Sequence, residues 1–129
     1  MTAKTITLQG VDAVDYLRGP NSPRDGSLVS MSIEQPSTAP TIKLTFQIPR
    51  CEGGFRSVEV TLTEVEEYEY SFSNSDPHTY LEEFKCLMTE TGDFYISLDP
   101  YDEREAFISD KDNHYFRSRA VKLTASEAF

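Results

Sequence analysis

The sequence predicts a mainly β fold, either an antiparallel sandwich or a partly open barrel, with one or two short helices. Apolar and polar residues alternate with a period of two in several segments, and these segments recur at the short intervals that hairpins produce. The chain of 129 residues is near the commonest domain size, and its seven tyrosines and eight phenylalanines can bury a large area. We therefore expect residues 1–129 to form a single acidic β-rich domain.

The first elements are predicted from short local patterns. Thr5–Leu8 alternates and is expected to form a strand. Val11–Arg18 is expected to form a short helix that is capped by Asp12, because aspartate side chains favour helix starts. The Gly-Pro pair that follows ends this helix, since proline cannot continue it. We expect Asn21–Gly26 to form an exposed loop.

A hairpin is the clearest prediction of the first half. Ser27–Glu34 and Thr41–Ile48 both alternate, and Pro49 ends the second of these strands because proline cannot donate to a central ladder. Cys51–Gly54 supplies a flexible reversal, and Ser57–Thr63 alternates again. The last two of these strands are therefore expected to pair with each other.

The middle of the chain is expected to continue as strand and loop. Tyr68, Tyr70 and Phe72 alternate with acidic and small polar residues, which predicts another strand. Val65 is out of phase with the preceding alternation, so we expect a turn or bulge near Thr63–Glu66. The short polar residues and proline of Ser73–Pro77 predict a loop.

The last third is predicted to contain a second hairpin and a final strand pair. Tyr80–Thr89 fits both helical and strand spacing, and the strand is favoured because a short turn at Thr91-Gly92 leads directly into the clear strand Asp93–Leu98. Asp99–Glu105 resembles a short helical turn, with Asp99 as its cap and proline at its first position. Phe107-Ile108 and Tyr115–Thr124 are expected to form the last strand pair. We expect Ala125–Phe129 to be frayed.

Charge restricts the classes of partner. The formal net charge is −10, and residues 64–112 hold 15 acidic against three basic residues. Such an excess repels nucleic acids and anionic membranes, so we expect neither as a partner and favour a basic protein. Met1–Leu8 has no apolar run typical of a signal peptide, and the two cysteines show no paired motif. A cytoplasmic location is therefore expected, with the chain as a monomer or homodimer.

We recognise no catalytic, cofactor-binding or metal-binding motif, and we expect no cofactor. Cys51, Cys86, His78 and His114 are too scattered in sequence to favour a zinc site. The segment 110–114 begins like a calcium loop but lacks the glycine and the final glutamate that such a loop needs, so a hairpin turn is expected there.

Acidic residues interleave with tyrosines in the second half, and this pattern admits two interpretations. It is typical of a strand with one buried and one charged face. It is also typical of a protein-binding surface, because tyrosine offers amphipathic contact area and acids attract a basic partner. The residues that we expect to contact a partner are Glu67, Glu69, Tyr70, Asp99, Tyr101, Asp102 and Glu103.

The stretch from Tyr68–Phe72 through Phe94–Arg104 resembles small uncharacterised bacterial β-rich proteins, some of which are thought to be immunity proteins that neutralise a secreted toxin. The resemblance covers about 60 residues in the second half of this small domain. It implies a protein that acts by binding and assigns no catalytic residue or toxin contact.

Three functional hypotheses follow. The leading one is a non-enzymatic protein-binding module, in its sharpest form an immunity protein that neutralises a basic toxin such as a nuclease. The second is a small-ligand or metal-assisted enzyme with its site near Asp99–Glu103, where paired carboxylates could hold a cation or transfer protons. The third is a structural subunit that associates with itself through an aromatic strand edge.

Overall fold

The computed structural model describes residues 5–35, 39–49, 55–71 and 80–128. In these residues the chain is 58% strand and forms one open antiparallel sheet of seven strands with a single short helix. The mainly β prediction is confirmed, and the open sheet corresponds to the partly open form that we expected. The elements are β1 (Thr5–Gln9), α1 (Val11–Arg18), β2 (Ser27–Glu34), β3 (Thr41–Pro49), β4 (Phe55–Glu69), β5 (Lys85–Met88), β6 (Phe94–Asp99) and β7 (Asn113–Ala128).

The sheet is organised around its two longest strands. Its order is β2-β3-β4-β7-β6-β5, and β1 pairs with the C-terminal part of β7, while β6 pairs with the N-terminal part. The predicted hairpin between β3 and β4 is confirmed, with Leu44 opposite Val60 in the register. β7 therefore carries a different neighbour on the same side along each half of its length.

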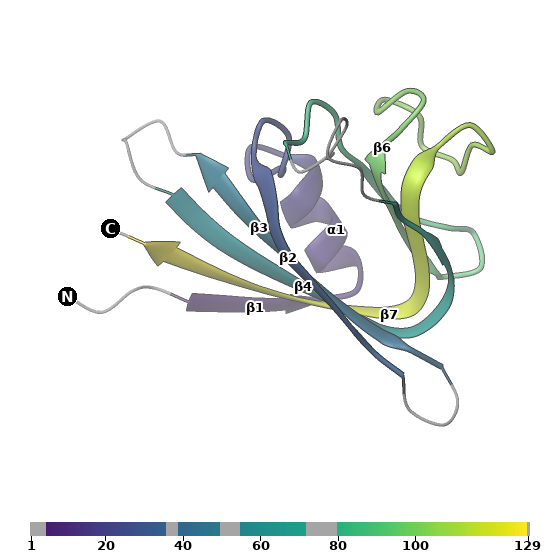
Figure 1. Ribbon diagram of the computed structural model, residues 1–129, viewed down its shortest axis with the longest axis horizontal. Helices are drawn as coiled ribbons and strands as arrows, with labels where there is room; N and C mark the ends of the chain where they lie inside the picture. Colours follow the sequence, from purple (N-terminus) through teal and green to yellow (C-terminus); the bar gives the residue numbers. More distant parts are fainter. Residues whose placement is uncertain (1–4, 36–38, 50–54, 72–79, 129) are drawn as a thin grey trace.

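β4 and β7 bend together, and the bend gives the sheet its concave shape (Figure 1). Their register shifts between Val65 and Glu67, and Glu64 has a φ of 55°, in the left-handed region. A bulge of this kind kinks a strand and increases its twist. The bulge predicted near Thr63–Glu66 is confirmed. The segment that begins at Tyr68 continues β4 up to Glu69 and does not form a separate strand.

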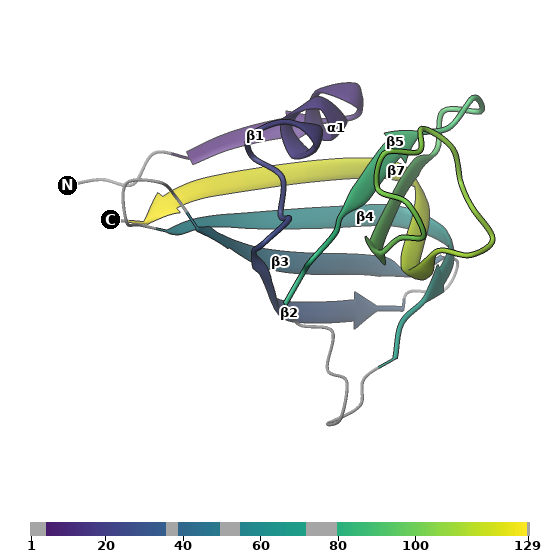
Figure 2. The same ribbon diagram turned by 90° about the horizontal axis from the view of Figure 1, so that it is seen from above.

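Helix α1 lies inside the curve of the sheet (Figure 1), beside β1 and β7 when the sheet is seen from above (Figure 2). Ala13, Val14 and Leu17 share one side of the helix and are buried in the main apolar core with residues such as Phe46. The helix begins and ends where the sequence predicts. The predicted cap is wrong, because Gly10 is the N-cap residue and no side chain caps the first turn.

Several other expectations are corrected. The loop after α1 is only partly exposed, since Pro23 and Gly26 are buried. The strand interpretation of Tyr80–Thr89 is confirmed for Lys85–Met88, while Tyr80 makes only an isolated bridge to Ser27. Ala125–Ala128 is not frayed, because it pairs with β4.

The connection between β6 and β7 differs most from the prediction. Asp99 is the last residue of β6 and caps no helix; the only turn near it joins the Glu105 N–H to the Asp102 carbonyl at 3.1 Å. Phe107 and Ile108 lie in the loop and pair with no strand of the described sheet. The predicted elements at Cys51–Gly54 and Ser73–Pro77 lie outside the described residues. No helix in the described part of the chain is long and apolar enough to cross a membrane.

Candidate functional site

Glu67 and Glu69 lie exposed on the face of the sheet that points away from α1, which we call the outer face. They stand opposite Arg117 and Tyr115 of β7 in the register. Burial, the charge of Glu67 and a hydrogen bond to it raise the pKa of Tyr115, and the charge of Glu69 adds to this. The Tyr115 ring stacks on Tyr95 at a centroid distance of 6.1 Å. Two of the predicted contact residues therefore share one acidic, aromatic surface.

Tyr70 does not belong to that surface. It follows Glu69 by one position, and neighbouring residues along an extended chain point to opposite faces. Its ring lies on the inner side, 5.0 Å from the His114 ring and 6.4 Å from the Phe116 ring between centroids. Tyr70 packs against the main core. It is a packing residue for the inner face.

The remaining predicted residues lie at the end of β6 and in the loop that follows. Asp99 is half-buried and pairs with Asn113 in the register. Tyr101 is exposed, and the Lys111 ammonium lies 4.7 Å from the centre of its ring, within cation–π range. Tyr101 therefore lies at the surface, as a contact residue must.

Asp102 and Glu103 each face a positive partner. Asp102 binds Arg104 at 3.0 Å, and hydrogen bonds from the Arg104 side chain and backbone lower the pKa of Asp102. Glu103 accepts the Phe84 N–H at 3.2 Å and pairs with Arg24 at 3.2 Å. The seven predicted residues therefore do not form one patch. Of the seven, Glu67 and Glu69 are the exposed carboxylates that a strand holds on the outer face.

The segment 100–112, which we call the strap, covers the outer face of β5 and β6. Tyr95 and Leu87 are 1% and 4% exposed, yet both are absent from the cluster that forms the main core. The strap rather than the helix buries them. Figure 2 shows this segment as a long loop beside β5 and β7. The chain thus has a second buried layer, on the opposite side of β5 and β6 from α1.

A buried carboxylate holds the strap in place. Asp112 Oδ2 accepts hydrogen bonds from Lys85 Nζ at 2.9 Å, from the Tyr95 hydroxyl at 2.7 Å and from the Ser109 N–H at 3.2 Å. Its Oδ1 accepts the Tyr101 N–H at 2.9 Å. Burial raises the pKa of Asp112, but these hydrogen bonds lower it by more, so the pKa lies below its ordinary value. We call Lys85, Tyr95 and Asp112 the latch.

Lys85 is the unusual member of the latch. Its side chain is 1% exposed, and a fully buried lysine is rare unless it is paired. Besides Asp112, its ammonium approaches Glu105 at 3.4 Å and lies 5.8 Å from the ring centres of Tyr95 and Phe107. Burial and the hydrogen bond to Asp112 in turn raise the pKa of Tyr95. The charges of the latch are thus satisfied within the protein.

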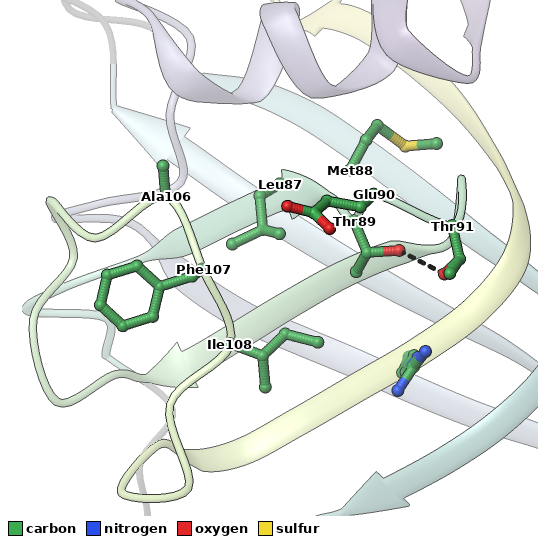
Figure 3. A pocket seen from close by; sticks show the side chains of 9 residues that line it. Leu87, Met88, Thr89, Glu90, Thr91, Ala106, Phe107 and Ile108 are labelled. Atoms are coloured by element: carbon green, nitrogen blue, oxygen red, sulfur yellow. Dashed lines mark hydrogen bonds between the residues drawn. The ribbon is translucent and has the colours of Figure 1, made fainter.

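An open cleft of about 340 Å³ lies between the strap and the end of β5, and we call it the strap cleft. Leu87 and Met88 of β5 and Phe107 and Ile108 of the strap supply its apolar lining (Figure 3). The rim is polar, with Thr89 and Thr91 hydroxyls 3.0 Å apart at the turn after β5. Phe107 and Ile108 remain 60% and 39% exposed.

Arg117 also lines the strap cleft, and its guanidinium pairs with Asp93 at 2.9 Å. In the register Arg117 stands between Glu67 on β4 and Tyr95 on β6. The strap cleft and the Glu67–Glu69 surface are therefore neighbours on the outer face, separated by the width of one strand.

A second cleft, of about 310 Å³, is polar and is lined in part by Arg18, Arg24, Arg104 and Glu103. Two of these arginines are already engaged in ion pairs with the acids beside them. Cys86 borders this cleft but is buried, and burial raises its pKa to about 12, so the thiol is protonated at neutral pH.

The described residues contain no group of three or more histidine, cysteine, aspartate or glutamate side chains arranged to hold a metal ion. Cys51 and His78 lie outside the described residues. Asp99, Asp102 and Glu103 do not converge: Asp99 sits in the sheet, and the other two carboxylates turn to separate arginines. The arrangement gives no support to the enzymatic hypothesis for this segment.

Sequence reasoning missed the latch and the strap cleft. The sequence predicts a hairpin turn around Asp112 and a strand at Phe107-Ile108, and neither prediction points to these features. One signal was present in the sequence: Lys85 stands between Phe84 and the apolar run Cys86–Leu87 in a segment with strand spacing. A lysine on a strand that is apolar on both sides needs a buried anion, which could have directed attention to the acids downstream.

No protein-family model, no curated protein and no solved structure matches this chain significantly. The resemblance to immunity-type proteins therefore stays a prediction, and the functional argument depends on the chain's own surface.

Proposed function

We propose that this chain is a non-enzymatic protein-binding module that contacts a basic partner through the outer face of β4 and β7. The observation that supports this most is the exposed pair Glu67 and Glu69 beside Tyr115. These acids belong to residues 64–112, a segment that contains 15 acidic and three basic residues. Such a field attracts a positively charged protein and orients it before contact.

In its sharper form, the proposal is that the partner is a basic toxin and that the chain is its cytoplasmic immunity protein. A toxin that acts on nucleic acid needs a positive surface to bind phosphates. An acidic protein surface competes with the phosphate backbone for that surface. To inhibit such a toxin, the chain needs only to occupy its phosphate-binding surface. A site made of tyrosine and carboxylate side chains can do this without a catalytic group.

The test compares two charge reversals of equal size. A partner is retrieved from the source cells on the immobilised chain, produced in pure form, and measured by surface plasmon resonance at low salt. Glu67→Lys with Glu69→Lys is expected to lower the association rate constant by roughly tenfold or more, because electrostatic steering is worth about 10–1,000-fold. The effect should shrink as salt is added.

The matched control is Asp12→Lys with Asp15→Lys, which changes the net charge equally but acts at exposed positions of α1, on the opposite side of the sheet. We expect this control to change the rate much less. Equal effects of the two double variants would contradict the assignment to the outer face. A partner without a positive surface, or one whose activity the chain leaves unchanged, would contradict the basic-toxin form.

A further inference from the structure

We propose that the strap cleft receives an apolar side chain of the partner, with Phe107 and Ile108 as its principal contacts and the latch as the device that holds them in position. This inference rests on the proposed function and extends it from charge attraction to a defined docking site. The occupant is a large apolar residue that stands among lysines or arginines on the partner's surface.

The first argument is the exposure of the two strap residues. Phe107 is 60% and Ile108 39% exposed, and they are adjacent in sequence above Leu87 and Met88. Aromatic and aliphatic groups that line a cleft are the usual anchors of protein interfaces. A volume of about 340 Å³ lies at the lower end of the roughly 300–1,000 Å³ typical of ligand pockets, which suits one or two side chains.

The second argument is that the wall of the cleft is fixed before the partner arrives. The strap has no strand pairing of its own, yet Asp112 receives four hydrogen bonds from Lys85, Tyr95, Tyr101 and Ser109. Glu105, which directly precedes Ala106 and Phe107 in the sequence, contacts the same lysine and so fixes the strap next to these two residues. A site that is already ordered loses less conformational entropy on binding, so the same contacts yield higher affinity.

The third argument is the charge around the cleft. Glu90 lies on its rim, Glu105 lies on the strap, and Glu67 lies one strand away beyond Arg117. The cation of the cleft, Arg117, is itself paired with Asp93. A basic surface around an apolar side chain complements this arrangement, whereas a second copy of this chain, with a net charge of −10, would be repelled.

The direct test replaces Phe107 by serine and measures the affinity of the purified partner. Phe107→Ser is expected to weaken binding by at least roughly tenfold, mainly through faster dissociation, because truncated anchors commonly have effects of this size. The matched control is Val29→Ser, since Val29 is 53% exposed on β2 at the opposite edge of the sheet. Unchanged affinity of Phe107→Ser would overturn the inference.

The two proposals fail in different ways. If Glu67→Lys with Glu69→Lys slows association but Phe107→Ser binds normally, the acidic surface stands and the cleft has no part in binding. If neither variant changes binding, the proposed function itself fails. If light scattering shows that the wild type self-associates and Phe107→Ser abolishes this, a second copy is the occupant and the inference is overturned.

The latch is tested separately with Asp112→Asn against Asp110→Asn, the same chemical change at an exposed position of the same loop. In Asp112→Asn an amide NH₂ group replaces one of the two carboxylate oxygens. The donors whose hydrogen bonds this oxygen accepts in the wild type would then face another donor. We expect amide hydrogen exchange in 100–112 to accelerate by roughly tenfold or more, because hydrogen bonds to a charged group are lost. Partner affinity should fall with it. Faster exchange with unchanged affinity would overturn the positioning role of the latch.

Discussion

Helix α1 and the strap cover opposite sides of the same short strand, β5, and they do so by different means. Cys86 points to the helix side and contacts the Val14 carbonyl, whereas Lys85 points to the strap. The helix is held by apolar side chains such as Leu17, which is fully buried. The strap is held by a buried ion pair and its hydrogen bonds. The helix layer depends mainly on apolar packing, whereas the strap depends largely on polar contacts, of which Asp112 makes four.

This difference teaches which of the two layers can change its position. Apolar packing is distributed over many contacts, so the loss of one of them leaves a helix in place at reduced stability. In a layer held by a few directional bonds, removal of the central group breaks all of its hydrogen bonds at once. The buried donors that it paired with are then left unsatisfied. We therefore expect the strap to be the part of the described chain whose stability can be separated from that of the sheet.

The largest expected effect is that of Asp112→Ala. It leaves the Tyr95 hydroxyl without its acceptor and removes the nearer carboxylate of the buried Lys85 ammonium, whose contact with Glu105 is longer, at 3.4 Å. Breaking a buried ion pair costs about 3–5 kcal/mol. Urea unfolding monitored by circular dichroism measures the change. Asp110→Ala, at an exposed position, should stay within about 0.5 kcal/mol of the wild type.

The double variant Lys85→Met with Asp112→Leu distinguishes an unpaired charge from lost packing. Replacing both members of a buried ion pair by apolar residues is often neutral or stabilising, so the double variant should recover the part of the loss that comes from the unpaired Lys85 charge. The part that comes from the Tyr95, Tyr101 and Ser109 donors should remain, because these donors still lack their acceptor. If the double variant is as unstable as Asp112→Ala, the strap is held by its backbone hydrogen bonds rather than by the charge pair.

A smaller effect is expected from Leu17→Ala in the helix layer. Leu17 is 0% exposed, and truncation of a buried leucine costs about 3 kcal/mol through lost transfer energy and the cavity that remains. Hydrogen exchange by mass spectrometry should show the destabilisation across the sheet and α1, with 100–112 no more affected than the rest. Exchange that rises only in α1 would show that the helix, like the strap, opens on its own.

The two layers also differ in how much of them the sequence predicts. The helix is encoded by local spacing, since Ala13, Val14 and Leu17 recur on one side of a helix and Gly19 ends it. The same holds for β2, β3 and the bulge in β4, where a break in the period of two marks the irregularity. These features are set by residues close together in the sequence, and therefore they can be predicted from the sequence alone.

The strap is not encoded locally. Asp99 and Pro100 have the pattern of a helix start, but the Tyr101 N–H is instead bound to Asp112, eleven positions away. Lys85 and Asp112 are 27 positions apart, and no periodicity connects them. For the candidate site, the sequence grouped Tyr70 with Glu67 and Glu69 as contact residues, although the same alternation places Tyr70 on the opposite face, where it packs against the core. It could not show that Asp102 and Glu103 would meet arginines, because those contacts arise from tertiary folding.

The pH dependence of stability offers the smallest and most specific test of the comparison. The folded pKa of Asp112 lies below the ordinary value of 3.8, because its hydrogen bonds outweigh the effect of burial. A carboxyl with a lowered folded pKa contributes stability that is complete above its unfolded pKa and is lost as the pH falls through the folded one. The helix layer, which is held by apolar contacts, has no such dependence.

The measurement is the difference in unfolding free energy between the wild type and Asp112→Asn at a series of pH values. We expect this difference to be constant between about pH 8 and pH 5 and to narrow progressively below about pH 4, as protonation of Asp112 removes the charge that the variant already lacks. The difference between the wild type and Leu17→Ala should stay constant over the same range. A gap for Asp112→Asn that widens in acid would mean that the carboxyl is protonated more readily in the folded chain than in the unfolded one, so that the latch would be a neutral hydrogen-bond network and not an ion pair.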